Sequence, residues 1–368
     1  MVKKILLSVF IVVVLIGGTA FTYLKHPKFG PSLEAIHSQA VLNSPNYVDG
    51  AFQNQIPTPL FTEDVSFVSV LWENLTEKKP DGLRPDGDIP TVKTDLAALN
   101  RDEDLVIWLG HSSYYVQLGG KRMLIDPVFS TYAAPVAFAN KVFDGANPYT
   151  VEDMPEIDVL LITHSHWDHL DYDTIKALEP KVGRAITALG VGSYLTYWGY
   201  PQDKVHDVDW NDAVDLGAGL SVHALPARHY TRRLMETAQT LWVAFAFISE
   251  DARLFFSGDS GYGPHFAEIG KRFGGFDLAA LDSGQYNRKW AFIHMNPEEA
   301  AQAALDLDAK NLMPAHIGKF SISNHAWDEP FRRISAASVD KPYNLLTPMI
   351  GEPLRLDAMP EAFSAWWE

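Results

Sequence analysis

The chain has 368 residues, a formal net charge of −16 and no cysteine. So acidic a chain is a poor match for nucleic acid. Without cysteine it can form no disulfide and must hold any metal through His, Asp or Glu. Hydrophobic residues make up 47% of the sequence and charged residues 21%, values typical of a folded globular protein.

An apolar run opens the chain. Residues 5–24 carry no charge over 20 positions, and Lys3 and Lys4 precede them. At about 1.5 Å per residue, a helix of this length spans the roughly 30 Å hydrocarbon core of a bilayer. We therefore expect residues 5–24 to be a membrane anchor, with the rest of the chain outside the cytoplasm, in the periplasm. A secreted protein is the alternative, because small residues before Phe21 also suit signal cleavage.

Residues 25–95 show little periodicity and many turn-forming residues, such as those at 44–47, 57–59 and 78–82. A short strand is expected at Val65–Trp72. This pattern predicts a loop-rich N-terminal extension that packs on the main domain. None of its residues stands out as carrying chemistry.

From Asp104 onward, short apolar runs alternate with turns and amphipathic segments. Strands are predicted at 105–109, 113–118, 122–125, 157–162, 185–188, 205–208, 220–225, 242–248, 253–257, 278–281 and 311–314. Helices are predicted at 172–178, after Gly192 as far as Tyr197, and at 297–307. Strands therefore dominate both halves of this region, with helices between them.

The strand at 157–162 leads into a dense cluster of ionisable residues. His164, His166, Asp168 and His169 follow it within a few positions. His164 and His166 lie two residues apart, so in an extended segment both point to the same side. Imidazole and carboxylate groups together suit zinc. The cluster predicts a metal site on the loop leaving the strand, where open α/β sheets place their ligands.

This His-x-His-x-Asp-His sequence after an apolar strand resembles the signature of the metallo-β-lactamase fold. The resemblance implies two stacked sheets with helices outside, an αβ/βα four-layer sandwich. The resemblance also implies further metal ligands beyond this cluster. His229, Asp259 and His316 are the candidates, because each follows a predicted strand beside small residues. We expect two zinc ions per chain. His164, His166 and His229 would hold one ion, Asp168, His169 and His316 the other, and Asp259 would bridge them.

Further motifs resemble one branch of that fold, the N-acyl-phosphatidylethanolamine-hydrolysing phospholipase D family, which is distantly related to ascorbate-6-phosphate lactonases. They lie at 45–47, 108–113, 124–127, 256–262, 268–274 and 294–300. The similarity runs from about Pro27 to about Pro353. It implies a zinc-dependent hydrolase that cleaves a phosphodiester in a small-molecule or lipid substrate. The alternative is a lactonase or β-lactamase-like hydrolase of a cyclic ester or amide, and a zinc protein without catalysis is a third possibility.

Asp168 and His294 are the expected catalytic residues. His294 precedes Asn296 and Pro297, which predict the start of a helix where a phosphate oxygen could rest. His111 and Asp126 are expected to orient ligand imidazoles. The cations expected nearest a phosphate are Arg232, Arg233 and Lys319.

Four segments are expected in all. Residues 1–24 form the anchor or signal peptide, 25–95 the extension, 96–353 the hydrolase domain and 354–368 a C-terminal tail.

Overall fold

The computed structural model describes residues 2–62, 72, 76, 78–233 and 237–368. The strand expected at Val65–Trp72 lies, except for Trp72, outside the described residues. Two seven-stranded sheets form the centre of the molecule.

The first sheet has the strand order β16-β3-β4-β5-β6-β7-β8. Neighbouring strands are antiparallel from β16 to β5 and parallel from β5 to β8. Gly119 and Gly120 make the tight turn between β4 and β5 with φ of 56° and 73°, a conformation that glycine adopts without strain. The strands are β3 (Leu105–Trp108), β4 (Tyr114–Leu118), β5 (Lys121–Ile125), β6 (Ile157–Ile162), β7 (Val182–Ala188), β8 (Val205–Val208) and β16 (Pro353–Arg355).

The second sheet repeats this plan, with the order β15-β14-β13-β12-β11-β10-β9. Its strands are parallel from β15 to β12 and antiparallel from β12 to β9. They are β9 (Ala213–Gly217), β10 (Leu220–Leu225), β11 (Ala244–Ile248), β12 (Arg253–Phe256), β13 (Leu278–Asp282), β14 (Asn311–Ala315) and β15 (Asn344–Leu345). Most residues of β10 to β14 are buried, because both faces of the sheet are covered.

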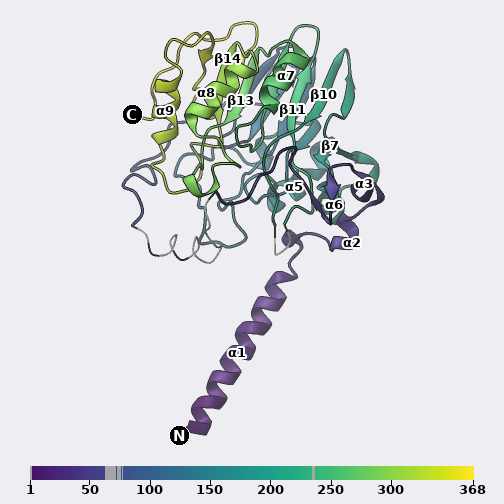
Figure 1. The fold of residues 1–368 in the computed structure, drawn as a ribbon, viewed down its shortest axis with the longest axis vertical. Helices are drawn as coiled ribbons and strands as arrows, with labels where there is room; N and C mark the ends of the chain where they lie inside the picture. Colours follow the sequence, from purple (N-terminus) through teal and green to yellow (C-terminus); the bar gives the residue numbers. More distant parts are fainter. Residues whose placement is uncertain (1, 63–71, 73–75, 77, 234–236) are drawn as a thin grey trace.

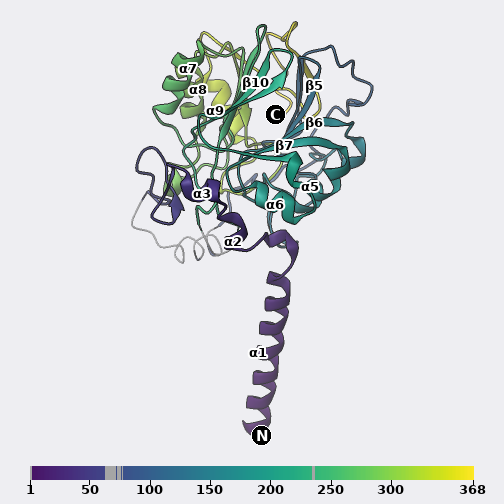
Figure 2. The ribbon, with the colours of Figure 1, turned by 90° about the vertical axis from the view of Figure 1, so that its right-hand side faces the viewer.

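Helices cover the outer faces (Figure 2). On the first sheet lie α5 (Tyr172–Leu178) and α6 (Gly192–Tyr197), and on the second lie α7 (His265–Phe273), α8 (Pro297–Asp306) and α9 (Glu329–Ala337). The larger hydrophobic core fills the space between the sheets, and a second core lies under α7 to α9. The expected αβ/βα four-layer arrangement is confirmed. Short 3₁₀ turns connect the elements: η1 (Pro27–Phe29), η2 (Val151–Asp153), η3 (Glu179–Lys181), η4 (Gln202–Lys204) and η5 (Arg288–Trp290).

The amino-terminal helix α1 (Val2–Leu24) projects away from the folded body (Figure 1). Its segment Lys3–Leu24 is long and apolar enough to cross a membrane, and none of it is buried. The extension that follows contains α2 (Leu33–Ile36), α3 (Gln39–Asn43), β1 (Tyr47–Val48) and β2 (Ala51–Phe52).

The strand directions bring the ends of many strands to one edge. Within the first sheet β3, β5 and β6 run in the same direction, and within the second β10, β12, β13 and β14 do so. A backbone bridge joins the two groups where His111 follows β3 and Ile317 follows β14. The residues after these strands therefore meet between the sheets.

Candidate metal centre

The expected ligands converge in two groups. In the first, Nδ1 of His166 lies 3.0 Å from Nε2 of His164 and 3.1 Å from Nε2 of His229. A carboxylate oxygen of Asp259 is 3.6 Å from each of those Nε2 atoms. Ligand atoms of these four residues all lie within 4.8 Å of one another. Three imidazoles and one carboxylate make a donor set that suits zinc.

The hydrogen bonds behind the rings fix where the protons lie. His229 donates Nδ1–H to the carbonyl of Ile293 at 2.9 Å. The Thr163 hydroxyl donates to Asp126, so it can only accept from Nδ1 of His164, 2.9 Å away. Both rings therefore present bare Nε2 lone pairs to His166, which can donate to only one of them. The arrangement favours a shared cation over hydrogen bonds among the rings.

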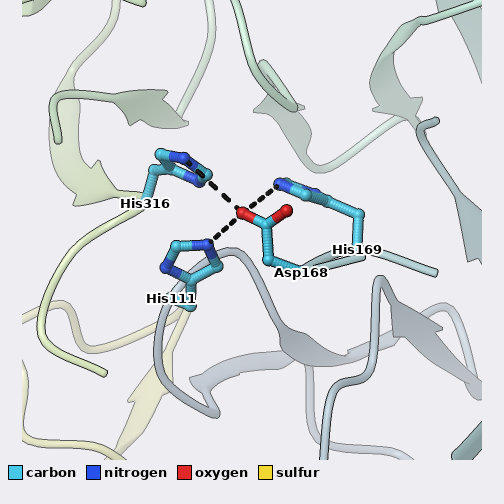
Figure 3. A group of neighbouring side chains, drawn as sticks. All are labelled: His111, Asp168, His169 and His316. Atoms are coloured by element: carbon cyan, nitrogen blue, oxygen red, sulfur yellow. Dashed lines mark hydrogen bonds and ion pairs between the residues drawn. The ribbon is translucent and has the colours of Figure 1, made fainter. Parts of the chain in front are cut away.

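The second group surrounds Asp168 (Figure 3). One carboxylate oxygen of Asp168 lies 2.9 Å from His111, 3.6 Å from Nε2 of His169 and 3.8 Å from Nε2 of His316. These four residues again bring ligand atoms within 4.8 Å of one another. His111 was expected to orient an imidazole, but here its Nε2 contacts the Asp168 carboxylate.

Asp259 lies between the two groups. Its second oxygen is 3.0 Å from Nε2 of His169 and 3.1 Å from Nδ1 of His316. Asp126 accepts Nδ1–H of His169 at 2.8 Å, which turns Nε2 of His169 toward Asp259. Nε2 of His169 and the facing Asp259 oxygen are buried and form no hydrogen bond. When the His169 ring is neutral, two buried acceptors face each other where a cation would satisfy both.

The pKa shifts of the histidines also favour a bound cation. Burial holds the pKa of His164, His229 and His316 well below its usual value, so these rings are neutral and able to bind a metal. Burial also acts to lower the pKa of His169, but Asp259 and Asp168 raise it well above its usual value. Without a metal, a proton on His169 thus supplies the positive charge that the two carboxylates require.

His294 lies beside this centre. Its Nδ1 is 2.9 Å from a carboxylate oxygen of Asp282, and its ring stacks on that of His316 at 5.1 Å. Asp282 is fully buried at the end of β13 and also accepts the backbone N–H of Ser260. Burial opposes it, but the Asp282 charge raises the pKa of His294. As expected, Asn296 caps the start of α8 and Pro297 lies in its first turn, and Glu299 completes a capping box with Asn296.

A cavity of about 420 Å³ opens over the centre. It is lined by side chains from both groups and by residues of the surrounding loops, among them His166, Asp168, Tyr230, Arg232, His294 and Ile322. A small molecule or the head of a larger one can reach Asp168 and His294 from this cavity.

Two of the three expected cations are engaged elsewhere. Lys319 is fully buried and donates to the carbonyls of Leu109 at 3.1 Å and Val128 at 2.8 Å. Arg233 is also buried, and its N–H groups bind backbone carbonyls. The expectation that Lys319 faces the substrate is wrong, because its ammonium is held by these carbonyls. Arg232 lines the cavity, and the side chain of Arg233 also reaches its lining although its N–H groups bind backbone carbonyls.

Two residues that contact the site, Asp282 and Asn54, were not predicted from the sequence. Asp282 ends a strand, as the other site residues do, and that position could have identified it. Asn54, in the extension, makes two hydrogen bonds to the backbone of His229, at 2.7 and 3.0 Å. Asn54 lies in a turn-rich segment, and no sequence pattern marks it as a partner of a distant histidine.

Known proteins resemble this chain in sequence and in fold. A family model described as "Beta-lactamase superfamily domain" matches residues 121–317. An uncharacterized protein of Mycobacterium tuberculosis is 36% identical over 345 residues, covering 91% of this chain and 90% of that protein.

N-acyl-phosphatidylethanolamine-hydrolyzing phospholipase D 1 of Caenorhabditis elegans is 32% identical over 226 residues, covering 58% of this chain and 63% of that enzyme. A metallo hydrolase from the archaeon Ignicoccus hospitalis shares the fold. Its TM-score is 0.53 at 19% identity, covering 68% of this chain and 97% of that structure.

Proposed function

This chain belongs to the metallo-β-lactamase superfamily and is a metal-dependent hydrolase of it, and we propose that it cleaves a phosphodiester with two zinc ions bound. The proposed ligands are His164, His166 and His229 for one ion, Asp168, His169 and His316 for the other, and Asp259 between them. The neutral imidazoles and the facing acceptor atoms support a bound cation, and a set of His and Asp ligands suits zinc.

Two zinc ions in these groups would activate a water for attack and neutralise charge on a phosphoryl oxygen. The protein's own residues do the rest. Asp126 and Thr163 fix the tautomers of His164 and His169. Asn54 holds the His229 backbone, and Asp168 faces the cavity where it can orient the attacking water.

The pairing of His294 with Asp282 is the observation that carries the phosphodiester assignment. With Nδ1–H bound to Asp282, the remaining nitrogen Nε2 can carry a proton toward the substrate. The Asp282 charge raises the pKa of His294, which favours the protonated ring while Asp282 is ionised. Nε2–H can then donate to a phosphate oxygen or to the departing alkoxide, a task that a neutral lactone needs less. The 32% identity to the nematode phospholipase D supports the same class of substrate.

Activity profiling of the purified protein tests this proposal. We expect turnover of a phosphodiester such as bis-p-nitrophenyl phosphate, at a higher kcat/KM than of a simple lactone or a β-lactam. A preference for the lactone or β-lactam would favour hydrolysis of a cyclic ester or amide and overturn the phosphodiester assignment.

We place the hydrolase domain at residues 96–353, with the extension at 25–95 and the tail at 354–368. Residues 5–24 lie within α1, which fits a membrane anchor or a signal sequence. We assign it as an anchor that holds the catalytic domain outside the cytoplasm, with a small-molecule or lipid substrate.

A further inference from the structure

A loop at the edge of the cavity is strongly apolar. Residues 132–140, here called the rim loop, contain no charged residue. The phenyl ring of Phe138 is 87% exposed, more than any other large hydrophobic side chain in the described ranges. Backbone hydrogen bonds close the base of the loop. Tyr132 and Lys141 form an antiparallel bridge, and the Ala133 N–H donates to the Asn140 carbonyl at 3.0 Å. Phe138 is thus presented to the outside by an ordered hairpin.

The rim loop is tied to the end of α1. The ammonium of Lys28 donates to the carbonyl of Pro135 at 2.8 Å, and the hydroxyl of Tyr23 donates to the same carbonyl. Ala133, Ala134 and Pro135 also line the cavity over the metal centre. The same short loop therefore contacts the base of α1 and forms one wall of the site.

A second set of contacts fixes the base of α1 to the metal loop. Phe29 packs edge-on against Trp167 at 5.5 Å. Arg233 donates to the carbonyl of Lys28 at 2.9 Å and, from the same guanidinium, to those of Ser165 at 3.1 Å and Leu170 at 2.9 Å. Its guanidinium also lies 3.9 Å from the Trp167 ring. These contacts fix η1, the turn that follows α1, against the metal loop, while α1 itself meets the domain through Tyr23.

These contacts determine what Phe138 faces. A bilayer crossed by α1 has its surface near Tyr23 and Lys28, where aromatic and basic residues commonly mark the interface. The rim loop touches both residues, whereas Lys141 at its base forms an ion pair with Asp144, 3.5 Å away. An uncharged, exposed aromatic hairpin beside the Lys28 ammonium matches a segment that inserts into the interface.

We infer that the rim loop is a second membrane contact, in which Phe138 inserts into the bilayer that α1 crosses. The cavity then opens at the membrane surface and receives substrate from the adjoining lipid leaflet. The inference rests on the proposed anchor and refines the proposed function, since it selects a lipid over a freely diffusing ester.

The lack of cysteine permits a direct test. Phe138→Cys in the full chain gives a single site for a polarity-sensitive fluorophore, with the protein reconstituted in phosphatidylcholine and phosphatidylglycerol vesicles. Val14→Cys, within α1, is the positive control. Val339→Cys is the matched control, because Val339 is 65% exposed and lies far from the site. It precedes Asn344, which pairs with Asn311 at the start of β14, whereas the site lies beyond the other end of that strand.

We expect the label at position 138 to shift to the blue and to be quenched by nitroxide-bearing acyl chains, whereas the label at 339 is not. Quenching at 14 but not at 138 overturns the inference and leaves the anchor standing. A blue shift at 138 without lipid quenching means that protein covers the loop, which also overturns it. No quenching at either position rejects the anchor as well.

Activity provides a second test. Phe138→Asp should leave turnover of soluble bis-p-nitrophenyl phosphate unchanged and reduce hydrolysis of a phosphodiester lipid in vesicles by about tenfold or more. Equal rates on the vesicles would overturn the inference. Failure of the unmodified protein to cleave either phosphodiester would reject the proposed function, while the quenching result would still decide the membrane contact.

Discussion

Asp259 contacts both groups of candidate metal ligands. One of its oxygens faces His164 and His229 at 3.6 Å, and the other faces His169 at 3.0 Å. Asp259→Ala removes the negative charge shared by the two groups, so we expect bound zinc to fall from two ions to one or none and activity to be lost. Asp203→Ala, at an exposed site in η4, should retain both ions. Elemental analysis of the purified proteins decides this, and full metal content in Asp259→Ala would reject a bridging role.

His294 is expected to act in catalysis without holding metal. His294→Ala should keep both zinc ions but reduce phosphodiester turnover by about 10²–10⁴-fold, since a positioned proton donor contributes that much. Asp282→Asn should reduce it less, because the ring remains while its charged partner is lost. The measurement is the ratio of mutant to unmodified kcat on bis-p-nitrophenyl phosphate and on a lactone. Equal losses on both substrates would contradict the proposed role.

Lys319 should make stability depend on pH. Burial lowers the pKa of its ammonium from 10.5 to about 7. Between these values the unfolded chain binds one more proton than the folded chain, so the free energy of unfolding should rise with pH, by at most about 1.4 kcal/mol per unit. In Lys319→Met this rise should be missing. Denaturant unfolding across that pH window compares the two proteins, and equal slopes would show that the buried amine is not the cause.

At the scale of elements, the sequence predicted the strands that lead into the site more reliably than their surroundings. The bounds of β6 and β10, which lead into the site, agree with the predictions because these segments are compact apolar runs with clear turn signals. The bounds of α5 and β8, outside the site, also agree. The second-sheet strand β9 was missed because three of its five residues are exposed and its pattern is weak. Helices α7 and α9 were missed as well, although each carries an apolar face.

The sequence predicts the proposed ligand set because every member follows a strand in a short local motif. Contacts between segments far apart in the chain could not be predicted from the sequence. His111, Asp126 and His316 adopt left-handed backbone with φ of 57°, 41° and 63°, a conformation that only their surroundings impose. The bond between His294 and Asp282 likewise depends on how α8 and β13 pack.

The extension contributes to the site through Asn54, whose amide binds both the N–H and the carbonyl of His229. Loss of a partner that orients a ligand typically lowers metal affinity about 10- to 100-fold, and we expect Asn54→Ala to fall in this range. Gln53→Ala is the matched control, because Gln53 is exposed and its amide bonds only Val48 and Ala51. Competition with a zinc chelator measures the affinity. An unchanged affinity in Asn54→Ala would show that the extension is dispensable to the site.

For the whole molecule, the proposed anchor role of α1 would determine where the chemistry takes place. If it is an anchor, the protein should remain in the membrane fraction after alkaline carbonate washing, because about 20 apolar residues hold it in the bilayer. Protease added outside the cytoplasmic membrane should then digest the catalytic domain. A soluble protein that begins at Phe21 would instead identify α1 as a cleaved signal peptide.

The position of the metal centre between the sheets also bears on how the chain matures. His164 leaves the first sheet and His316 leaves the second, so the centre joins residues 152 positions apart in the sequence. Contacts of such separation form late in folding, after the ends of a long loop have met. If the proposed zinc ions bind here, they can bind tightly only once both halves have been synthesised and docked, and their binding energy would then oppose separation of the halves. Metal loading would then be the closing step of assembly, and a chain that stops before β14 would lack it.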